Sequence, residues 1–290
     1  MKFKKGIILA AGKGTRLAPA TKVTVKPLLP LYDKPLLYYA LSNLINAGVR
    51  EVLFISQKQD IPQFKKLFGT GKQLGMKFNY TYQKKQIGIP DAINIAEKFI
   101  AKKPFILALA DNLFIGKSFK SILRQVQLTK SEAAVLAVKT KYPSKSAVIE
   151  FDKKKNIQSI IEKPKNPKSN LTIPGLYFYD HQSIPVIKKL KPSKRGELEI
   201  VDVHLHYLQR ENLNVFPLNK DVKWFDTGDA EEMLEASNYV HKYQKKNKTL
   251  VGSIELESYK NGWISKKQLK ILINQLPGSN YKLSLEHFYK

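Results

Sequence analysis

Two short basic segments near the start of the chain carry the residue types that bind phosphate groups. Residues 12–16 read Gly-Lys-Gly-Thr-Arg, and Lys26 follows ten residues after Arg16. Glycines let backbone N–H groups approach phosphate oxygens, and a guanidinium can donate two parallel hydrogen bonds to a phosphate. These residues predict a phosphate-binding turn with fixed cations. The alternative is a simple turn with a surface arginine and a lysine that extends to solvent.

The spacing within this turn excludes two common nucleotide-binding motifs. A dinucleotide-binding fingerprint requires a third glycine or an alanine at the position of Leu17. A Walker loop requires a lysine directly after its last glycine, and here Thr15 follows Gly14. The turn therefore predicts phosphate binding of another kind.

The turn follows a short apolar run that predicts a buried strand, and ligands of parallel sheets bind beyond the carboxyl ends of such strands. In the first half of the chain, these strands alternate with helical patterns, which is typical of a parallel sheet with helical crossovers. The second half is richer in strands. The predicted strands are residues 7–10, 51–56, 78–83, 105–110, 133–138, 147–151, 157–162, 175–179, 214–218 and 222–225. The predicted helices are residues 35–47, 61–68, 90–100, 197–211, 229–243 and 266–274.

These elements predict an α/β protein with a Rossmann-like, mixed and mostly parallel central sheet flanked by helices. We expect residues 1–230 to form the catalytic domain and residues 231–290 to form a helical C-terminal subdomain. His204 and His206 would share the face of a strand but not that of a helix. Because their segment predicts a helix, we expect no metal site there.

The composition limits the possible chemistry. The chain contains no cysteine, which excludes disulfides, thiolate nucleophiles and cysteine-ligated metals. No apolar run approaches the roughly 20 residues that a membrane helix requires. The apolar stretch near the start has only about five residues, fewer than the roughly 7–15 of a secretory signal. We therefore expect a cytoplasmic protein without a membrane partner.

The net charge of +26 allows three interpretations. It could reflect lysines spread over a solvated surface, attraction of polyanionic substrates to a cleft, or nucleic-acid binding. The lysines are scattered as pairs and triplets, and neither a basic stripe interleaved with aromatic residues nor a helix-turn-helix pattern accompanies them. We favour the solvated surface, followed by substrate attraction, and expect no nucleic-acid partner.

Several further motifs, together with the turn, resemble those of the glucose-1-phosphate thymidylyltransferases, which are sugar-1-phosphate nucleotidylyltransferases. The matching segments are residues 6–17, 26–30, 33–35, 38–39, 109–114, 162–164, 175–180, 195–200 and 224–228. The resemblance implies a fold of the nucleotide-diphospho-sugar transferase type, which agrees with the sheet predicted above. It also implies a homotetramer or a dimer, with contacts through the C-terminal helices.

The resemblance implies that a hexose 1-phosphate attacks the α-phosphorus of dTTP or UTP and displaces pyrophosphate. Such an in-line transfer requires mainly positioning and charge neutralisation from the protein. By this resemblance, Arg16 and the glycine turn hold the pyrophosphate, Lys26 lies near the reacting phosphates, and Lys163 neutralises the sugar phosphate. Asp111 and Asp226 would together hold one Mg²⁺, which is the expected cofactor.

The same resemblance defines two sets of binding residues. Gln83 and Gly88 would contact the pyrimidine, and Glu162 would contact sugar hydroxyls. The nucleotide-binding set is Leu9, Ala11, Gly12, Gly14, Thr15, Gln83, Gly88 and Asp111. The sugar-phosphate-binding set is Leu109, Ala147, Glu162, Lys163 and Ile173. Taken without the resemblance, Asp111 could cap a helix, Asp226 could form an Asx turn, and Glu162 could end a solvated strand.

Positions near the expected base and sugar depart from the family pattern. Pro90 and Asp91 replace an alanine and a glutamine of the base-binding loop, and Ser146 and Ala147 replace a tyrosine-glycine pair. Ala11 stands where the family commonly has glycine, although alanine also occurs there in related uridylyltransferases. The expected phosphate and metal residues are all retained. We therefore expect nucleotidylyl transfer, with dTTP and glucose 1-phosphate favoured. The alternatives are a uridylyltransferase and a non-catalytic regulator that binds nucleotide-sugars.

Overall fold

One large mixed sheet forms the centre of the protein. The computed structural model describes residues 3–154 and 156–289. The strands of this sheet are β1 (Lys5–Leu9), β4 (Glu51–Ser56), β5 (Lys77–Tyr82), β6 (Phe105–Leu109), β8 (Ala133–Lys139), β9 (Ala147–Phe151), β10 (Ile157–Glu162), β11 (Leu171–Ile173), β12 (Leu176–Tyr179) and β13 (Leu213–Pro217). Their spatial order is β10-β9-β11-β8-β12-β6-β1-β4-β5, and β13 pairs with β8 outside this path.

The strands β5, β4, β1 and β6 are parallel neighbours, and β1 leads into the glycine turn. Ile7 and Ile8 of β1 point to opposite faces and are both fully buried, as expected for a parallel strand covered on both sides. The strand β12 is antiparallel to β6 and to β8, and the sheet continues with antiparallel pairs through β11 and β9 to β10. The predicted mixed α/β sheet is therefore confirmed.

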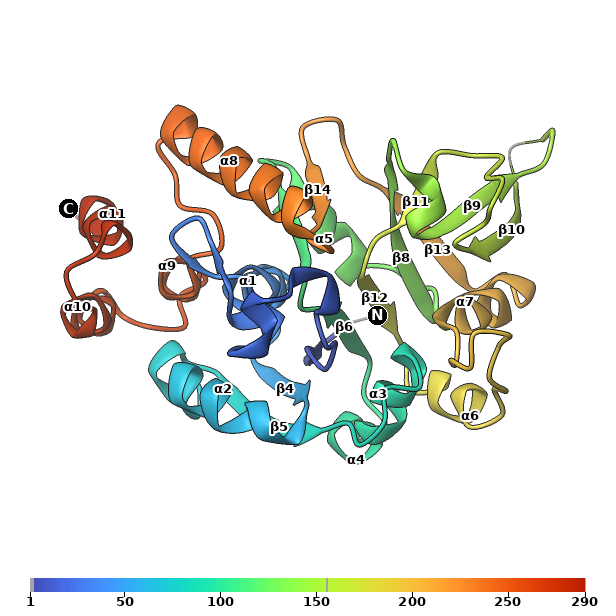
Figure 1. Cartoon of the computed structure of the whole chain (residues 1–290), viewed down its shortest axis with the longest axis horizontal. Coiled ribbons are helices and arrows are strands. Elements are labelled where there is room, and N and C mark those ends of the chain that lie inside the picture. Colours follow the sequence, from blue (N-terminus) through green and yellow to red (C-terminus); the bar gives the residue numbers. More distant parts are fainter. Residues whose placement is uncertain (1–2, 155, 290) are drawn as a thin grey trace.

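Helices cover both faces of this sheet (Figure 1). The helices are α1 (Leu37–Asn46), α2 (Ile61–Phe68), α3 (Ile89–Ile95), α4 (Glu97–Ile100), α5 (Phe119–Gln127), α6 (Ser183–Ile187), α7 (Ile200–Gln209), α8 (Ala230–Asn247), α9 (Ile254–Lys260), α10 (Lys266–Gln275) and α11 (Asn280–Tyr289). Residues of α1, α2, α5 and α9–α11 join one core cluster, and residues of α3, α6 and α7 join the cluster on the other face. None of the helices in the described ranges is long and apolar enough to cross a membrane.

Two small sheets lie outside the central one. The strands β2 (Pro30–Leu31) and β3 (Lys34–Pro35) form a hairpin, and β7 (Asn112–Ile115) pairs with β14 (Lys223–Asp226). Six single turns of 3-10 helix are η1 (Thr15–Leu17), η2 (Ala20–Lys22), η3 (Lys26–Leu28), η4 (Lys58–Asp60), η5 (Lys72–Leu74) and η6 (Pro143–Lys145). The sequence did not predict β2, β3, β7, β11, α5, α6, α9 or α11.

Three predicted helices differ from the observed ones, and the one expected over residues 229–243 continues to Asn247. The helix expected over residues 197–211 begins only at Ile200, because the Leu198 N–H donates to the Ile87 carbonyl at 2.7 Å and holds that segment extended. The helix expected over residues 90–100 is divided into α3 and α4 at Ala96.

The C-terminal helices share their core with the rest of the chain. Ile254, Leu269 and Leu285 are almost fully buried and belong to the same cluster as Leu41 of α1 and Phe54 of β4. Figure 1 shows α9–α11 at one end of the molecule and β9–β10 at the other. The division at residue 230 remains a prediction, with hydrophobic packing continuous across it.

Candidate active site

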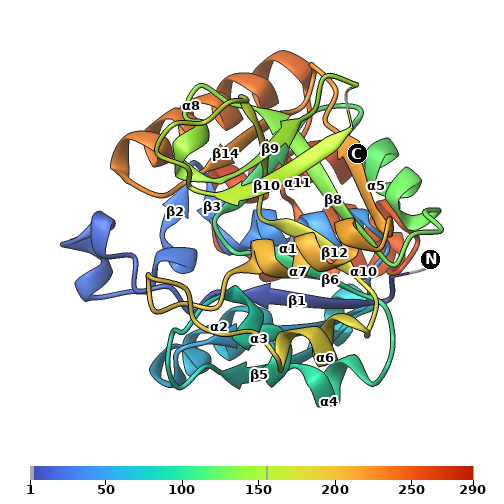
Figure 2. The ribbon, with the colours of Figure 1, turned by 90° about the vertical axis from the view of Figure 1, so that its right-hand side faces the viewer.

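The predicted phosphate-binding turn at residues 12–16 follows β1 at the carboxyl end of the parallel strands. Leu9, which ends β1, pairs with Leu109, which ends β6, so the two strand ends share one sheet edge. Gly14 has a φ of 62°, in the left-handed region that favours glycine, and its carbonyl accepts a hydrogen bond from the Thr21 hydroxyl at 3.0 Å. Figure 2 shows the dark blue segment after β1 projecting from the body of the molecule.

Asp111 follows β6 at the same edge and is bonded on both carboxylate oxygens. Lys26 Nζ donates to its Oδ2 at 2.7 Å, and Asn112 Nδ2 donates to its Oδ1 at 2.9 Å. Removal from bulk water raises the pKa of Asp111, but the Lys26 charge and these hydrogen bonds outweigh that effect. The pKa therefore lies below its ordinary value, and Asp111 is a carboxylate at neutral pH.

Asp226 reaches Asp111 through the pairing of two short strands that are distant in sequence. Asn112 begins β7, Asp226 ends β14, and the two residues are partners across the small sheet. The Asp111 carbonyl accepts hydrogen bonds from the Thr227 backbone N–H at 3.1 Å and from the Thr227 hydroxyl at 3.0 Å. Trp224 Nε1 also donates to Asn112 Oδ1 at 2.7 Å. These bonds fix the end of β14 against the end of β6.

The environment of Asp226 favours its protonated form. Burial, followed by the negative charge of Asp111, raises its pKa to about 7, although Lys26 acts in the opposite direction. One lysine thus serves two neighbouring acid groups. The pair can accept a further positive charge, because a cation between the two groups would relieve their repulsion.

A cavity of about 230 Å³ opens in front of the two acid groups, and we call it the site cavity. Predicted site residues that line it are Arg16, Leu109, Asp111, Ala147, Glu162, Lys163, Ile173 and Asp226. Residues that line it without having been predicted as site residues are Ile89, Asn112, Lys145, Ser146, Gly175, Tyr177, Arg195, Glu197, Leu198, Glu199, Ile200 and Trp224. Four cations from separate segments thus share one small space with five acid groups.

Other predicted site residues lie beside the site cavity and not in its lining; they are Leu9, Ala11, Gly12, Gly14, Thr15, Lys26, Gln83 and Gly88. Lys26 is joined to the cavity through its bond to Asp111. Gly88 forms a bridge with Leu198, which does line the cavity. A Cβ at Gly88 would lie 2.1 Å from the Leu198 carbonyl oxygen, so only glycine permits this close approach.

Three residues of the predicted sugar-phosphate set are brought together by strand register. Ala147 at the start of β9 pairs with Glu162 at the end of β10 on one side and with Ile173 at the end of β11 on the other. The next residue, Lys163, has a φ of 42°, which a residue with a side chain seldom adopts, and its N–H donates to the Ser146 carbonyl at 3.2 Å. A strained residue of this kind often marks a functional site.

Arg195 is a cation of the site that the sequence analysis did not assign. Its guanidinium lies 3.6 Å from Glu162, 3.2 Å from Glu197 and 3.6 Å from Glu199. Lys163 Nζ lies 3.8 Å from Glu162 on the other side. Burial raises the pKa of Glu162; Lys163 lowers it and Glu199 raises it further. Arg195 belongs to one of the matching motifs, which was the signal available in the sequence.

The amide of Gln83 has a fixed orientation. Its Nε2 donates to Asp91 Oδ2 at 2.7 Å and to the Gly88 carbonyl at 3.3 Å. Both partners are acceptors, so the amide nitrogen must face them. Among the described residues, none donates to Gln83 Oε1, which leaves an acceptor for a ligand. Gln86 Nε2 donates to the Ala11 carbonyl and joins this loop to the glycine turn.

His204 and His206 lie in the helix α7, as predicted for their segment. His204 is buried in α7 with its Nδ1 2.8 Å from the Tyr179 hydroxyl, and burial lowers its pKa to about 3. Across residues 3–154 and 156–289, no group of three or more His, Asp or Glu side chains is arranged to hold a metal ion. Asp111 and Asp226 are two such side chains, and a cation held there would need other ligands as well.

A family model described as "Nucleotidyl transferase" matches residues 5–243. The glucose-1-phosphate thymidylyltransferase of Neisseria gonorrhoeae is 40% identical over 283 residues, which is 98% of both chains. The chain belongs to the nucleotidyl transferase family. The glucose-1-phosphate thymidylyltransferase of Mycolicibacterium smegmatis is also 40% identical to this nucleotidyltransferase, over 96% of both chains. The resemblance inferred from the motifs is thereby confirmed.

Solved structures agree with this assignment. A Bacillus anthracis protein assigned to the glucose-1-phosphate thymidylyltransferases, crystallised with sucrose, shares 34% identity and a TM-score of 0.75. That alignment covers 81% of this nucleotidyltransferase and 94% of the other chain. A UDP-glucose pyrophosphorylase in complex with UDP-glucose shares 28% identity and a TM-score of 0.73, over 83% of this chain and 99% of the other.

Proposed function

We propose that this nucleotidyltransferase joins dTTP or UTP to a hexose 1-phosphate, with dTTP and glucose 1-phosphate favoured, and releases pyrophosphate. The observation that carries the proposal is the site cavity, which Arg16, Lys163 and Arg195 line together with the acid groups of Asp111 and Asp226. Transfer between phosphorylated substrates depends on positioning and on cations that neutralise phosphate charge. The names of the relatives support the same substrates.

The position of each cation supports a distinct role. Arg16 and the glycine turn lie at the end of β1 and would hold the departing pyrophosphate, with Lys26 behind Asp111 near the reacting phosphates. Lys163 and Arg195 lie beside Glu162 and would neutralise the sugar phosphate, while Glu162 would accept hydrogen bonds from sugar hydroxyls. The backbone N–H of Ala147 and the apolar side chains of Leu109 and Ile173 would line the sugar.

The acid pair fits a hard divalent cation. Lys26 and Arg16 both lower the pKa of Asp226, but burial and the Asp111 charge still raise it to about 7. We propose that Asp111 and Asp226 hold Mg²⁺ together with substrate phosphate oxygens, which is the usual way proteins bind this ion. The bound ion would neutralise phosphate charge. Lys26 would then keep Asp111 ionised and correctly oriented.

The orientation of the Gln83 amide favours the binding of a pyrimidine whose N3 carries a hydrogen. Its Nε2 is bonded to Asp91 and Gly88, so Oε1 would accept that N–H. Uracil and thymine both offer it, whereas cytosine offers an acceptor there. The two bases differ by one methyl group, which is worth only about 1–3 kcal/mol of discrimination. A uridylyltransferase is therefore the second candidate, supported also by the similarity to the UDP-glucose enzyme.

We also propose a cytoplasmic homotetramer or dimer. Nucleoside triphosphates and sugar phosphates are held in the cytoplasm, which supports that location. Leu234 on α8, Ile271 on α10 and Leu283 on α11 are large apolar residues at least 42% exposed, and contacts between copies would cover them. The mass of the protein in solution, measured by light scattering, tests the assembly.

The proposed reaction is tested with a panel of dTTP, UTP and CTP against glucose 1-phosphate and related hexose phosphates, with Mg²⁺. We expect pyrophosphate release with dTTP or UTP. Asp111→Asn and Asp226→Asn should each reduce turnover by about 100-fold or more, because each removes a charge at the reacting phosphates. The matched control is Asp221→Asn, an exposed acid on the turn before β14 that lies outside the site cavity. Nucleotide-sugar binding without turnover across the panel would favour the non-catalytic alternative.

A further inference from the structure

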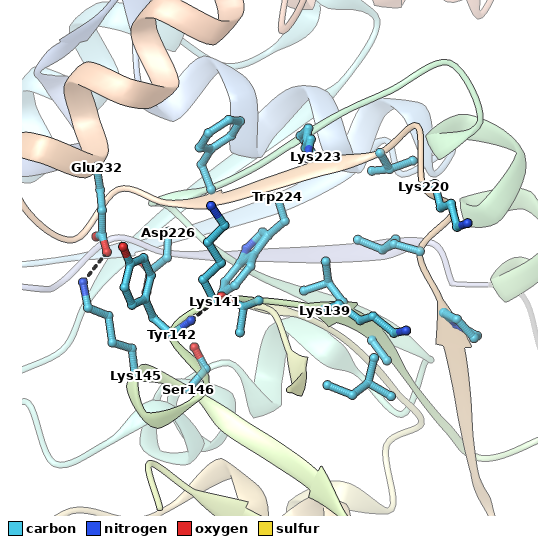
Figure 3. A pocket seen from close by; sticks show the side chains of 18 of the residues that line it. Lys139, Lys141, Tyr142, Lys145, Ser146, Lys220, Lys223, Trp224, Asp226 and Glu232 are labelled. Carbon is cyan, nitrogen blue, oxygen red and sulfur yellow. Dashed lines mark hydrogen bonds and ion pairs between the residues drawn. The ribbon is translucent and has the colours of Figure 1, made fainter. Parts of the chain in front are cut away.

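A second and larger cavity adjoins the site cavity. It has a volume of about 730 Å³ and lies between the β8–β9 connection, the β13–β14 turn and the first part of α8. We call it the outer cavity. Lys145, Ser146, Trp224 and Asp226 line both cavities, so the two spaces meet at these residues. Ser146 has the smallest side chain of the four and leaves room at the junction. Figure 3 shows these residues at one end of the outer cavity.

The outer cavity is rich in cations without partners. Its lining contains the lysines Lys139, Lys141, Lys145, Lys220 and Lys223. Lys145 is already ion-paired, with Glu232 at 2.6 Å and with Asp229 at 3.6 Å. Among the described residues, no carboxylate lies within ion-pair distance of the other four lysines. They come from two segments far apart in sequence, so neighbouring positions in the chain do not explain their convergence.

The side chains are arranged so that a ligand could extend from one cavity into the other. In Figure 3, Lys141 extends beside Trp224, while Lys139 and Lys220 lie further from Ser146. Tyr142 and Trp224 add aromatic surface next to the junction. Lysines outnumber the acid groups Asp226, Glu232 and Glu235 in this lining by five to three, and an anion beside the four unpaired ammonium groups would lower their mutual repulsion. Sugar rings pack well on aromatic faces, and phosphate or carboxylate groups pair with lysine.

We propose that the outer cavity binds a second anionic group on the sugar-phosphate substrate. This inference rests on the proposed function, because it assigns the site cavity to the sugar 1-phosphate. The inference refines the favoured sugar given under the proposed function, from glucose 1-phosphate to a hexose 1-phosphate that carries a further phosphate or carboxylate, projecting past Ser146 toward Lys141. Glucose 1-phosphate itself would be accepted but would leave the outer cavity unused.

Glucose 1,6-bisphosphate is the probe. We expect its KM to be at least about fivefold lower than that of glucose 1-phosphate, because each lysine contact contributes modestly. The difference should shrink as NaCl is raised from about 0.05 M to about 0.5 M, since salt screens exposed charges. Equal KM values for the two sugars at low salt would overturn the proposal.

The triple variant Lys141→Gln/Lys220→Gln/Lys223→Gln tests the residues. It should abolish the preference for glucose 1,6-bisphosphate and leave kcat/KM for glucose 1-phosphate unchanged. The matched control is Lys242→Gln/Lys245→Gln/Lys246→Gln, which removes three exposed lysines of α8 outside the outer cavity. The control should keep the preference, and its loss there would show that overall charge alone is responsible.

Binding measured by calorimetry separates failure of this inference from failure of the proposed function. If no sugar phosphate is turned over, the proposed function fails. Tighter binding of glucose 1,6-bisphosphate to the wild type than to the triple variant would still support the outer cavity as an anion site. Equal binding by the two proteins would refute it, whatever the turnover.

Discussion

If Asp226 holds Mg²⁺ as proposed, its carboxyl group would couple metal binding to pH. Its pKa of about 7 lies above the ordinary value of 3.8, because burial and the Asp111 charge both favour the protonated form. A magnesium ion binds the ionised form and must displace the proton below that pKa. We therefore expect the apparent affinity for Mg²⁺ to fall about tenfold per pH unit below pH 7 and to be constant above it.

Calorimetric titration of Mg²⁺ between about pH 5.5 and 8.5 measures this dependence. Asp226→Asn should bind Mg²⁺ more weakly and show a much smaller pH dependence, because its amide cannot titrate. A wild-type affinity that is independent of pH over the same range would exclude Asp226 as a ligand.

A second prediction at the scale of single residues concerns Asp91, which orients the amide of Gln83. Because Asp91 and Gly88 both accept from Nε2, the amide would present only Oε1 to a base bound as proposed. Asp91→Ala would let the amide rotate and offer Nε2 to the acceptor of cytosine. We expect the preference for UTP over CTP, measured as a ratio of kcat/KM values, to fall about tenfold.

Asn94→Ala, on the exposed side of the same helix, is the control and should retain the preference. If Asp91→Ala lowers activity with UTP and CTP equally, Asp91 supports only the fold of the loop.

At the scale of elements, the β2–β3 hairpin is fastened to the helices by a buried lysine. The Lys34 ammonium pairs with Asp33 and lies 4.9 Å from the ring centre of Tyr39 on α1 and 5.1 Å from that of Tyr281 on α11. Burial lowers the pKa of Lys34, and Asp33 opposes that effect. Lys34→Met would leave the Asp33 charge buried without its cation, with only the Gln244 amide donating to it at 3.3 Å.

We expect Lys34→Met to lower the free energy of unfolding by about 3–5 kcal/mol. Lys188→Met, which breaks the exposed pair with Glu97, should cost less than about 1 kcal/mol. Denaturant titration of both variants provides the comparison. Similar small losses in the two variants would show that the hairpin is held by apolar packing alone.

The elements also show what could be predicted from the sequence and what could not. Apolar runs and helical spacing located β1, β4, β6 and most of the longer helices, because burial on both faces leaves a clear pattern. The strand pair β7–β14 was not predicted, since strands of four residues carry little pattern and their pairing spans more than a hundred residues. That pairing is what places Asp226 beside Asp111.

The same distinction holds for the candidate site: local motifs could be predicted from the sequence, and contacts between distant segments could not. Arg16, Asp111 and Lys163 were found because they belong to local motifs. The bond from Lys26 to Asp111 and the orientation of Gln83 by Asp91 depend on contacts between separate segments, which no spacing rule supplies. The outer cavity could not be predicted from the sequence either, because the pairing of β8 with β13 is what brings its lysines together.

At the scale of the whole molecule, the helices after α8 complete the core. Ile254, Leu256, Leu269, Ile273 and Leu285 are each at most 3% exposed and pack in the cluster that covers α1 and β4. Burial of each such side chain contributes about 1.5–3 kcal/mol, so the five together contribute about 7–15 kcal/mol. This is as large as the entire free energy of unfolding of a typical domain, about 5–15 kcal/mol.

We therefore expect a chain that ends at residue 247 to lose cooperative unfolding and to expose apolar surface. A chain that ends at residue 279 lacks only α11 and should fold with reduced stability, because it loses Leu285 and the bond from the Tyr281 hydroxyl to Glu255. Thermal unfolding followed by circular dichroism, with a dye that binds apolar surface, distinguishes the two truncations. A cooperative transition in the shorter chain would mean that residues 1–247 fold on their own. The C-terminal helices would then be a separate unit, and their shared packing would be a contact between domains.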